Sequence, residues 1–212
     1  MKLTVLGATG GIGGHVVQQA LSDGHQVTAV VRDPTRLTLP DHPQLEVATA
    51  DVMDPSQLAS LIAGRDAVIS ALGHRGGRGP TTVCFDGAVS LATAAREVGL
   101  RRVLLVSVSG GYIEKNDDAV TRWAVKPLLQ RILKNGFADA DAMEHEIRAS
   151  GLDWTIVRPP RLTNGPRTGR YRTAAAVGIR GGYTAARADV ADCLLHLVDQ
   201  PDAIGATITV AR

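Results

Sequence analysis

The sequence predicts an α/β fold: one domain whose mostly parallel, doubly wound sheet carries helices on both faces. Short apolar, β-branched runs alternate with longer segments of helical period, which is typical of β-α-β units. The length of 212 residues suits one domain, and an apolar share of 44% is enough for a buried core. No repeat or linker divides the chain, so we expect a single domain over residues 1–212.

The apolar runs predict the strands, at residues 2–6, 26–31, 45–48, 67–70, 103–107, 154–157 and 207–210. Helical faces are expected between them, formed by Ile12, Val16, Val17, Ala20 and Leu21, then by Ala88, Leu91, Ala92, Ala95 and Val98, and finally by Val190, Leu194, Leu197 and Val198. Further helices are expected at 123–133 and 139–149. Asp54-Pro55 is typical of a helix start, with the end at Gly64. Residues 74–80 and 159–182 are predicted substrate-site loops.

Charge and cysteine content limit the classes of partner. The net charge is only +2 with the signs interspersed, which favours a small anionic ligand over nucleic acid. No stretch approaches the roughly 20 apolar residues that span a bilayer, and no feature sets an oligomeric state. Cys84 and Cys193 match neither a disulfide framework nor a metal site, which favours buried thiols in a reducing cytoplasm. Glu144-His145-Glu146 lacks a second histidine at metal spacing and is interpreted as a solvated face.

A glycine-rich segment, Gly7-Ala8-Thr9-Gly10-Gly11-Ile12-Gly13, follows the first predicted strand and opens the first predicted helix. Glycine permits a tight turn at position 7, close approach of a pyrophosphate at 10 and close helix packing at 13. Free N–H groups at the helix N-terminus favour an anion. The pattern predicts a Rossmann-type dinucleotide site with Gly7, Thr9, Gly10, Gly11, Ile12 and Gly13 at the cofactor; a turn without a ligand is the alternative.

The end of the second predicted strand bears on which dinucleotide is bound. An NAD-specific protein usually places Asp or Glu there for the ribose 2′-OH, whereas this chain places Arg32, followed by Asp33. The planar fork of arginine suits a phosphate, so we favour NADP(H). The alternative is that both charges are solvated and Asp33 selects NAD. Asp51 and Val52 fall where adenine is expected, although Asp51 is equally suited to a helix entry.

Several segments together resemble a known family. They are Gly7 to Gly13, Val31-Arg32-Asp33 with Arg36-Leu37, Leu72-Gly73-His74-Arg75 with Pro80-Thr81-Thr82-Val83, and Arg158-Pro159-Pro160 with Thr168-Gly169. They are similar to the atypical short-chain dehydrogenase/reductase group, and within it to the biliverdin reductase B or flavin reductase family, over nearly the whole chain. The resemblance implies that cofactor contacts come from Arg32 and Arg36 at the 2′-phosphate, Asp51 and Val52 at adenine, Leu72, Gly73 and Arg75 along the cofactor, and Pro159 and Pro160 at nicotinamide.

The sequence departs from that family beside the hydride acceptor. Arg161 stands where the family has histidine, and the family's serine falls nearest Val108, between Ser107 and Ser109. We take Ser107, Ser109 and Arg161 as candidate catalytic residues; for the serines a strand-end turn is the alternative. Arginines 75, 78, 161 and 167 favour an anionic substrate if they converge, and are solvated charges otherwise. His74 is either an acid or an exposed loop residue.

A Tyr-x-x-x-Lys proton relay is not matched, because Asn116 stands four residues after Tyr112 and Lys115 is one place short. We therefore expect an NADPH-dependent oxidoreductase that transfers hydride to a flavin or similar conjugated acceptor. The alternatives are an NmrA-like NADP-binding redox sensor without turnover and an enzyme like the sugar-nucleotide epimerases and dehydratases.

Overall fold

The computed structural model describes residues 1–74, 79–110, 122–123 and 126–212. An eight-stranded sheet in the order β3-β2-β1-β4-β5-β6-β10-β8 forms its centre, and all neighbouring strands are parallel except β10 and β8. The strands are β1 (Lys2–Leu6), β2 (Gln26–Val31), β3 (Leu45–Thr49), β4 (Ala67–Ser70), β5 (Arg102–Val106), β6 (Asp153–Arg158), β8 (Arg172–Ala175) and β10 (Ala206–Ala211). The predicted fold class is confirmed.

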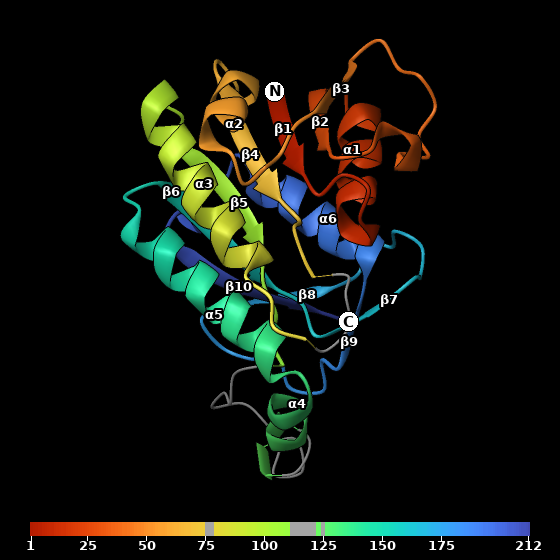
Figure 1. Ribbon diagram of the computed structural model, residues 1–212. Helices are drawn as coiled ribbons and strands as arrows, with labels where there is room; N and C mark the ends of the chain where they lie inside the picture. The colour runs from red at the N-terminus through yellow and green to blue at the C-terminus, as the bar shows by residue number, and fades with distance from the viewer. Residues whose placement is uncertain (75–78, 111–121, 124–125) are drawn as a thin grey trace.

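Helices cover both faces of this sheet, and Figure 1 shows α3 and α5 side by side on one of them. The α-helices are α1 (Gly11–Ser22), α2 (Pro55–Ile62), α3 (Val83–Val98), α4 (Lys126–Ile132), α5 (Lys134–Ala149) and α6 (Arg187–Leu197). One apolar core joins α1 and α6 to the sheet, and a second joins α2, α3 and α5 to it. Along β1, Leu3 and Val5 face the first core while Leu6 faces the second, as strand alternation requires.

Local sequence signals set several of the element boundaries. The carboxylate of Asp54 accepts hydrogen bonds from the backbone N–H of Ser56 (2.9 Å) and Gln57 (3.4 Å), and Pro55 is the first residue of α2. Helix α2 ends at Ile62, and Gly64 follows with φ of +66°. The predicted cap and stop are therefore confirmed. The strands β1, β2 and β4 also match their predicted bounds, whereas β5 ends at Val106 and leaves Ser107 just past the strand.

The C-terminal half departs further from the predicted elements. Helix α5 begins at Lys134 instead of residue 139, and the backbone N–H of Phe137 already donates to the carbonyl of Leu133 (3.1 Å) despite the low helix propensity of Asn135 and Gly136. The segment 159–182 is not only loop. It contains β7 (Arg161–Thr163), which pairs in parallel with β9 (Thr184–Ala186), as well as β8, which closes one sheet edge. Strands of three or four residues are too short for alternation to be detected. Among the described residues, no helix is long and apolar enough to cross a membrane.

Candidate functional site

The strand order defines where a ligand binds on this sheet. From β1 the chain builds outward to β2 and β3 on one side, and from β4 it builds to β5 and β6 on the other. In open α/β sheets, ligands lie at the carboxyl ends of the strands beside such a switch point. The segments that follow β1, β2, β3, β4, β5 and β6 hold the residues predicted for the cofactor and its acceptor. The topology therefore brings the separate sequence motifs to one edge of the sheet.

The turn after β1 can be built only with glycine. Gly7 has φ of +77°, and a Cβ on it would lie 2.6 Å from the carbonyl oxygen of Ala71, at the end of β4. A Cβ on Gly13 would lie 2.8 Å from the carbonyl carbon of Gly7 and 3.1 Å from the Cα of Ala8. The first turn of α1 is thus pressed against the loop after β1. These are the tight turn and close packing that the glycine spacing predicts.

The N-terminus of α1 is arranged to receive an anion. Gly10 precedes the helix in an extended conformation, no side chain caps the helix, and its first turn contains no acidic residue. Ile12 is buried in the core below α1, so only its backbone faces the turn. Gly11 is exposed and Thr9 is half-buried. Unpaired N–H groups at a helix N-terminus together with the helix dipole favour a phosphate, so this cradle fits a dinucleotide pyrophosphate.

The end of β2 carries charges of both signs, on Arg32, Asp33 and Arg36. The carboxylate of Asp33 accepts hydrogen bonds from the backbone N–H (3.0 Å) and the hydroxyl (2.6 Å) of Thr35, and caps a short 3₁₀ helix over Pro34–Arg36. These hydrogen bonds lower the pKa of Asp33. Arg32 and Arg36 are both exposed. Asp33 therefore has a local structural role, while the two guanidinium groups remain at the surface of the strand end.

Asp51, in the segment after β3, forms hydrogen bonds with the residues that lead into α2. Its carboxylate accepts a hydrogen bond from the N–H of Met53 (3.0 Å), while its own N–H donates to the side chain of Gln57 (3.1 Å). This is an Asx turn leading into α2, the helix-entry alternative for Asp51. Val52 is buried in the second core. Whether either residue also contacts adenine stays a prediction.

The segment after β4 places Leu72 between the sheet and α3. A Cβ on Gly87 would lie 2.6 Å from a methyl carbon of Leu72, so the absence of a side chain at 87 makes room for this leucine. Gly73 and His74 follow at the surface. Arg75 and Arg78 lie outside the described residues, as do Tyr112, Lys115 and Asn116. Their predicted roles stay predictions.

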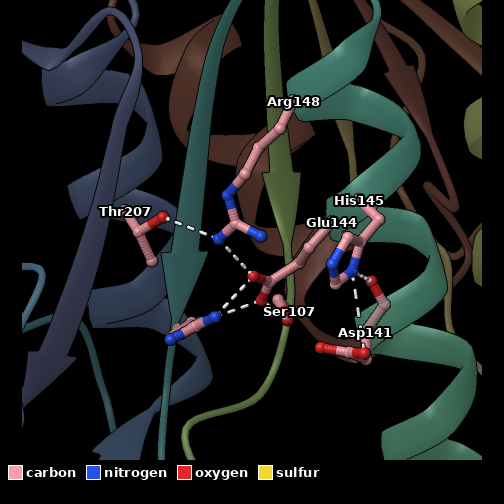
Figure 2. A network of polar contacts seen from close by, with 7 residues as sticks. Ser107, Asp141, Glu144, His145, Arg148 and Thr207 are labelled. Atoms are coloured by element: carbon pink, nitrogen blue, oxygen red, sulfur yellow. Dashed lines mark hydrogen bonds and ion pairs between the residues drawn. The ribbon is translucent and has the colours of Figure 1, made fainter.

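The end of β5 is tied to a buried carboxylate. The hydroxyl of Ser107 donates a hydrogen bond to Glu144 on α5 (2.5 Å), and Glu144 has no exposed surface. Arg158 at the end of β6 donates to both carboxylate oxygens (2.8 and 2.5 Å), and Arg148 donates to one of them (2.6 Å). Arg148 also contacts Thr207, and Figure 2 shows it above the Glu144 carboxylate.

Glu144 was predicted as part of a solvated face, and for this residue that prediction is wrong. Glu144 lies on the apolar face of α5 with Ala140, Met143 and Ile147, a helical spacing that the sequence displays. Burial alone would raise the pKa of Glu144, but hydrogen bonds from Arg158 and Ser107 and the charge of Arg158 outweigh it and lower the pKa. Glu144 is therefore ionised at neutral pH. His145 on the same helix is exposed, as expected.

Ser109 and the proline pair link the ends of β5 and β6. The backbone N–H of Ser107 donates to the carbonyl of Val157 (2.8 Å), and that of Ser109 donates to the carbonyl of Pro159 (3.0 Å). Pro159 is buried, Pro160 is half-buried, and Ser109 is 8% exposed. These contacts place both candidate serines beside the predicted nicotinamide border. Arg161 is exposed and opens β7.

Arg167 is paired with two carboxylates. It forms an ion pair with Asp192 on α6 (2.5 Å) and a longer one with Asp23 (3.8 Å), so its charge is already used to hold the loop onto α6 and α1. Asp189 holds the same loop, because its carboxylate accepts from the backbone N–H groups of Thr168 (2.6 Å) and Gly169 (3.1 Å). The structure therefore gives no support to a substrate-facing Arg167, which was one of the two alternatives for this residue.

Neither cysteine is arranged as a nucleophile or a metal ligand. Cys84 and Cys193 are free, and burial, followed by a neighbouring carboxylate charge, raises the pKa of each to about 12. Among the residues that the structure describes, no group of three histidine, cysteine or acidic side chains is placed to hold a metal ion.

The parallel sheet, its switch point and the glycine cradle define a dinucleotide-binding protein of the Rossmann type. The chain belongs to the NAD(P)H-binding family, whose family model matches residues 7–201. It is 36% identical over 177 residues to an uncharacterized chloroplastic protein of Arabidopsis thaliana; the match covers 79% of this chain and 61% of that protein.

Two other similar proteins are matched over a larger share of their own length. An uncharacterized sugar epimerase of Bacillus subtilis (strain 168) is 28% identical over 205 residues, covering 94% of this chain and 89% of its own. The crystal structure of an oxidoreductase from Lactococcus lactis superposes with a TM-score of 0.81 at 25% identity, covering 100% of this chain and 91% of the other. The chain is thus an NAD(P)H-binding protein similar to oxidoreductases and epimerases.

Proposed function

We propose that this protein is an NADPH-dependent oxidoreductase that transfers hydride to a flavin or a similar conjugated acceptor. When bound, NADPH supplies the hydride, and water supplies the proton that completes reduction of the acceptor. The protein binds and orients both partners at the carboxyl edge of β1, β4 and β5. The likeness to an oxidoreductase of Lactococcus lactis supports the reaction class.

The preference for NADPH rests on the end of β2. The Asp33 carboxylate is engaged by Thr35, whereas Arg32 and Arg36 are exposed beside it. Both hydrogen bonds end on one oxygen of the Asp33 carboxylate and hold this side chain in its own turn, which makes it less available to the ribose 2′-OH of NAD. An exposed guanidinium fork offers charge-assisted hydrogen bonds to a 2′-phosphate. We therefore assign the 2′-phosphate to Arg32 and Arg36, with the adenine beside Asp51 and Val52.

The observation that carries the acceptor class is the hydrogen bond from Ser107 to Glu144. Because Glu144 is ionised and buried, the Ser107 proton stays on this bond, and the Ser107 oxygen can accept a hydrogen bond but cannot act as a general acid. A carbonyl substrate needs such an acid, whereas a flavin or quinone delocalises the charge it receives. In this proposal Ser107 and Ser109 orient the nicotinamide amide or the acceptor, and Arg161 meets an anionic group of the acceptor.

The test is the oxidation of NADPH by flavin mononucleotide, followed by the absorbance of the reduced nicotinamide, with NADH in parallel. Turnover with NADPH preferred is expected. Arg32→Ser should weaken NADPH binding about 10- to 100-fold, the worth of a lost charge-assisted contact, and leave NADH binding unchanged. Arg131→Ser, an exposed arginine on α4, is the matched control. Equal affinities for both cofactors in the wild-type protein would rule out the assigned 2′-phosphate site.

A second candidate is an epimerase-like reaction, which the likeness to the Bacillus subtilis sugar epimerase favours. Product analysis with nucleotide sugars separates it from the first, since an epimerase returns its cofactor to the starting oxidation state. Tight NADPH binding without turnover of flavins, quinones or sugars would instead favour a sensor. The reducing compartment expected from Cys84 and Cys193 is part of the same proposal.

A further inference from the structure

Arg187, the first residue of α6, lies across the first turn of α1. A Cβ on Gly11 would lie 2.5 Å from the Cδ and 2.7 Å from the Nε of Arg187. The space that a side chain at position 11 would take is thus occupied by an arginine from a strand-helix junction 176 positions later in the chain. Gly11 is not required for a turn, since it is the first residue of a regular helix. The absence of a side chain at position 11 leaves room for the Arg187 side chain in this position.

Two contacts hold Arg187 in this position. Its Nη1 donates a hydrogen bond to the side-chain oxygen of Asn164 (2.5 Å), which is an uncharged partner. The N-terminus of α6 is itself fixed on α1, because the buried side chain of Gln19 donates to the carbonyl of Ala188 (2.9 Å). Across the described ranges, no carboxylate forms an ion pair with Arg187. Its charge is oriented without being neutralised.

A cation at this place is unfavourable unless an anion is bound there. The first turn of α1 presents the positive end of the helix dipole and has neither an acidic residue nor a side-chain cap. A guanidinium group beside it adds a full positive charge to the same region. Arginine donates in a fork that matches two phosphate oxygens. The combination is suited to a ligand with more than one negative charge.

We propose that Arg187 binds the pyrophosphate of the dinucleotide from the side of α6, and that Asn164 orients it. The inference rests on the NAD(P)H site and deepens it, but it is independent of the acceptor and of the 2′-phosphate assignment. The pyrophosphate is common to both cofactors, whereas the 2′-phosphate belongs to NADPH alone. Loss of Arg187 must therefore weaken NADPH and NADH by the same factor, whereas loss of Arg32 changes their ratio.

The experiment measures the Kd of NADPH and of NADH for the full chain by calorimetry. Arg187→Met keeps an apolar stem over Gly11 and removes the charge. Both Kd values should rise about 10- to 100-fold with their ratio unchanged, and Arg187→Lys should lie between wild type and Arg187→Met. Arg131→Met on α4 is the matched control and should leave both values unchanged. The melting temperature of each variant without cofactor reports whether the fold is retained.

Unchanged affinities in a folded Arg187→Met variant would overturn the proposal, as would a loss confined to NADPH. If Arg187→Met does not fold, the variant Asn164→Asp tests the proposal instead. It places a carboxylate on the same guanidinium group and should weaken the binding of both cofactors by the same factor. Unchanged binding in Asn164→Asp would then overturn the inference. If the wild-type chain binds neither cofactor, the cofactor site itself fails; if it binds both and the variants are unaffected, only the role of Arg187 fails.

Discussion

The hydroxyl of Ser107, one residue past the end of β5, donates a 2.5 Å hydrogen bond to Glu144, a carboxylate with no exposed surface. Glu144 in turn accepts hydrogen bonds from Arg158 and Arg148. One buried anion thus connects α5 to the ends of β5 and β6 and fixes the rotamer of a candidate site residue. This part of the site is therefore held in place by side-chain charges in addition to the backbone hydrogen bonds of the sheet.

Replacement of Glu144 should be strongly destabilising. In Glu144→Gln the carboxylate is removed while Arg158, with its side chain 13% exposed, keeps its charge. Breaking one side of a buried ion pair costs about 3 kcal/mol of unfolding free energy. Denaturant unfolding measures this loss, and Glu146→Gln, on a partly exposed position of the same helix, is the control. A loss in Glu144→Gln no larger than in the control would contradict the network's role.

The same carboxylate makes stability depend on pH. The pKa of Glu144 is lower in the folded protein than its ordinary value of 4.5, so this group stabilises the fold above about pH 4.5. That contribution is lost as the pH falls through the folded-state pKa, because the folded state must then take up a proton at the cost of the network. Unfolding free energies of wild type and Glu144→Gln should therefore converge in acid. A gap that stays constant down to pH 3 would contradict this linkage.

Asp139 should stabilise the N-terminus of α3 and lower the reactivity of the Cys84 thiol. Its carboxylate accepts from the N–H groups of Cys84 (3.1 Å) and Phe85 (2.9 Å) in the first turn of α3. Asp139→Asn should cost about 1 kcal/mol of unfolding free energy, the worth of a charged helix cap.

The same substitution should speed alkylation of Cys84. Burial is the main cause of the raised pKa of this thiol and Asp139 the second, so the pKa should fall from about 12 yet stay above 9.0. The pH profile of the alkylation rate checks this. Asp141→Asn, an exchange outside this cap, should leave the profile unchanged.

The elements with strong local signals were predictable from the sequence. Strands β1, β2 and β4 are short apolar runs between turns, and the Asp54-Pro55 start of α2 depends on neighbouring residues only. Part of the glycine cradle was predictable for the same reason, since Gly13 packs within the β1–α1 unit and Gly7 packs against the end of the neighbouring strand β4. The family resemblance added the cofactor's other contacts, which remain predictions.

The interactions between distant elements were not predictable in the same way. Glu144 and Ser107 are separated by 37 positions, and Arg187 meets Gly11 only because α6 packs beside α1. A single glutamate in a helix gives little sign of the two arginines that will surround it. Its place on the apolar face of α5 was the one available signal. An acidic residue on such a face is therefore a candidate partner for a buried cation.

A buried arginine should anchor the end of α6. Arg102, 9% exposed, donates to the carbonyls of Val198 (2.9 Å), Leu197 (2.7 Å) and Asp153 (2.8 Å). A cation there complements the negative end of the helix dipole. Arg102→Met should lower the unfolding free energy by about 3 kcal/mol, since one buried and two part-buried carbonyls lose a charged donor. Arg101→Met, on an exposed pair with Asp153, should cost less than about 1 kcal/mol. Equal losses in both variants would contradict the anchor.

Two neighbouring glycines in α1 provide a matched test of the cradle. A Cβ on Gly13 would overlap the carbonyl group of Gly7, which is backbone and cannot move aside without opening the turn, whereas a Cβ on Gly14 would lie 3.4 Å from the carbonyl oxygen of Ala8. Gly13→Ala should therefore displace α1 from the turn and raise the Kd of both NADPH and NADH at least about 10-fold, since the pyrophosphate loses its aligned N–H groups. Gly14→Ala needs a shift of a few tenths of an ångström at most and should leave both Kd values within about threefold. Calorimetric titration of the two variants, with apo melting temperatures as a check on folding, makes the comparison. Equal affinities in the two alanine variants would show that the close packing at position 13 serves the fold alone and that the cradle tolerates a moved helix.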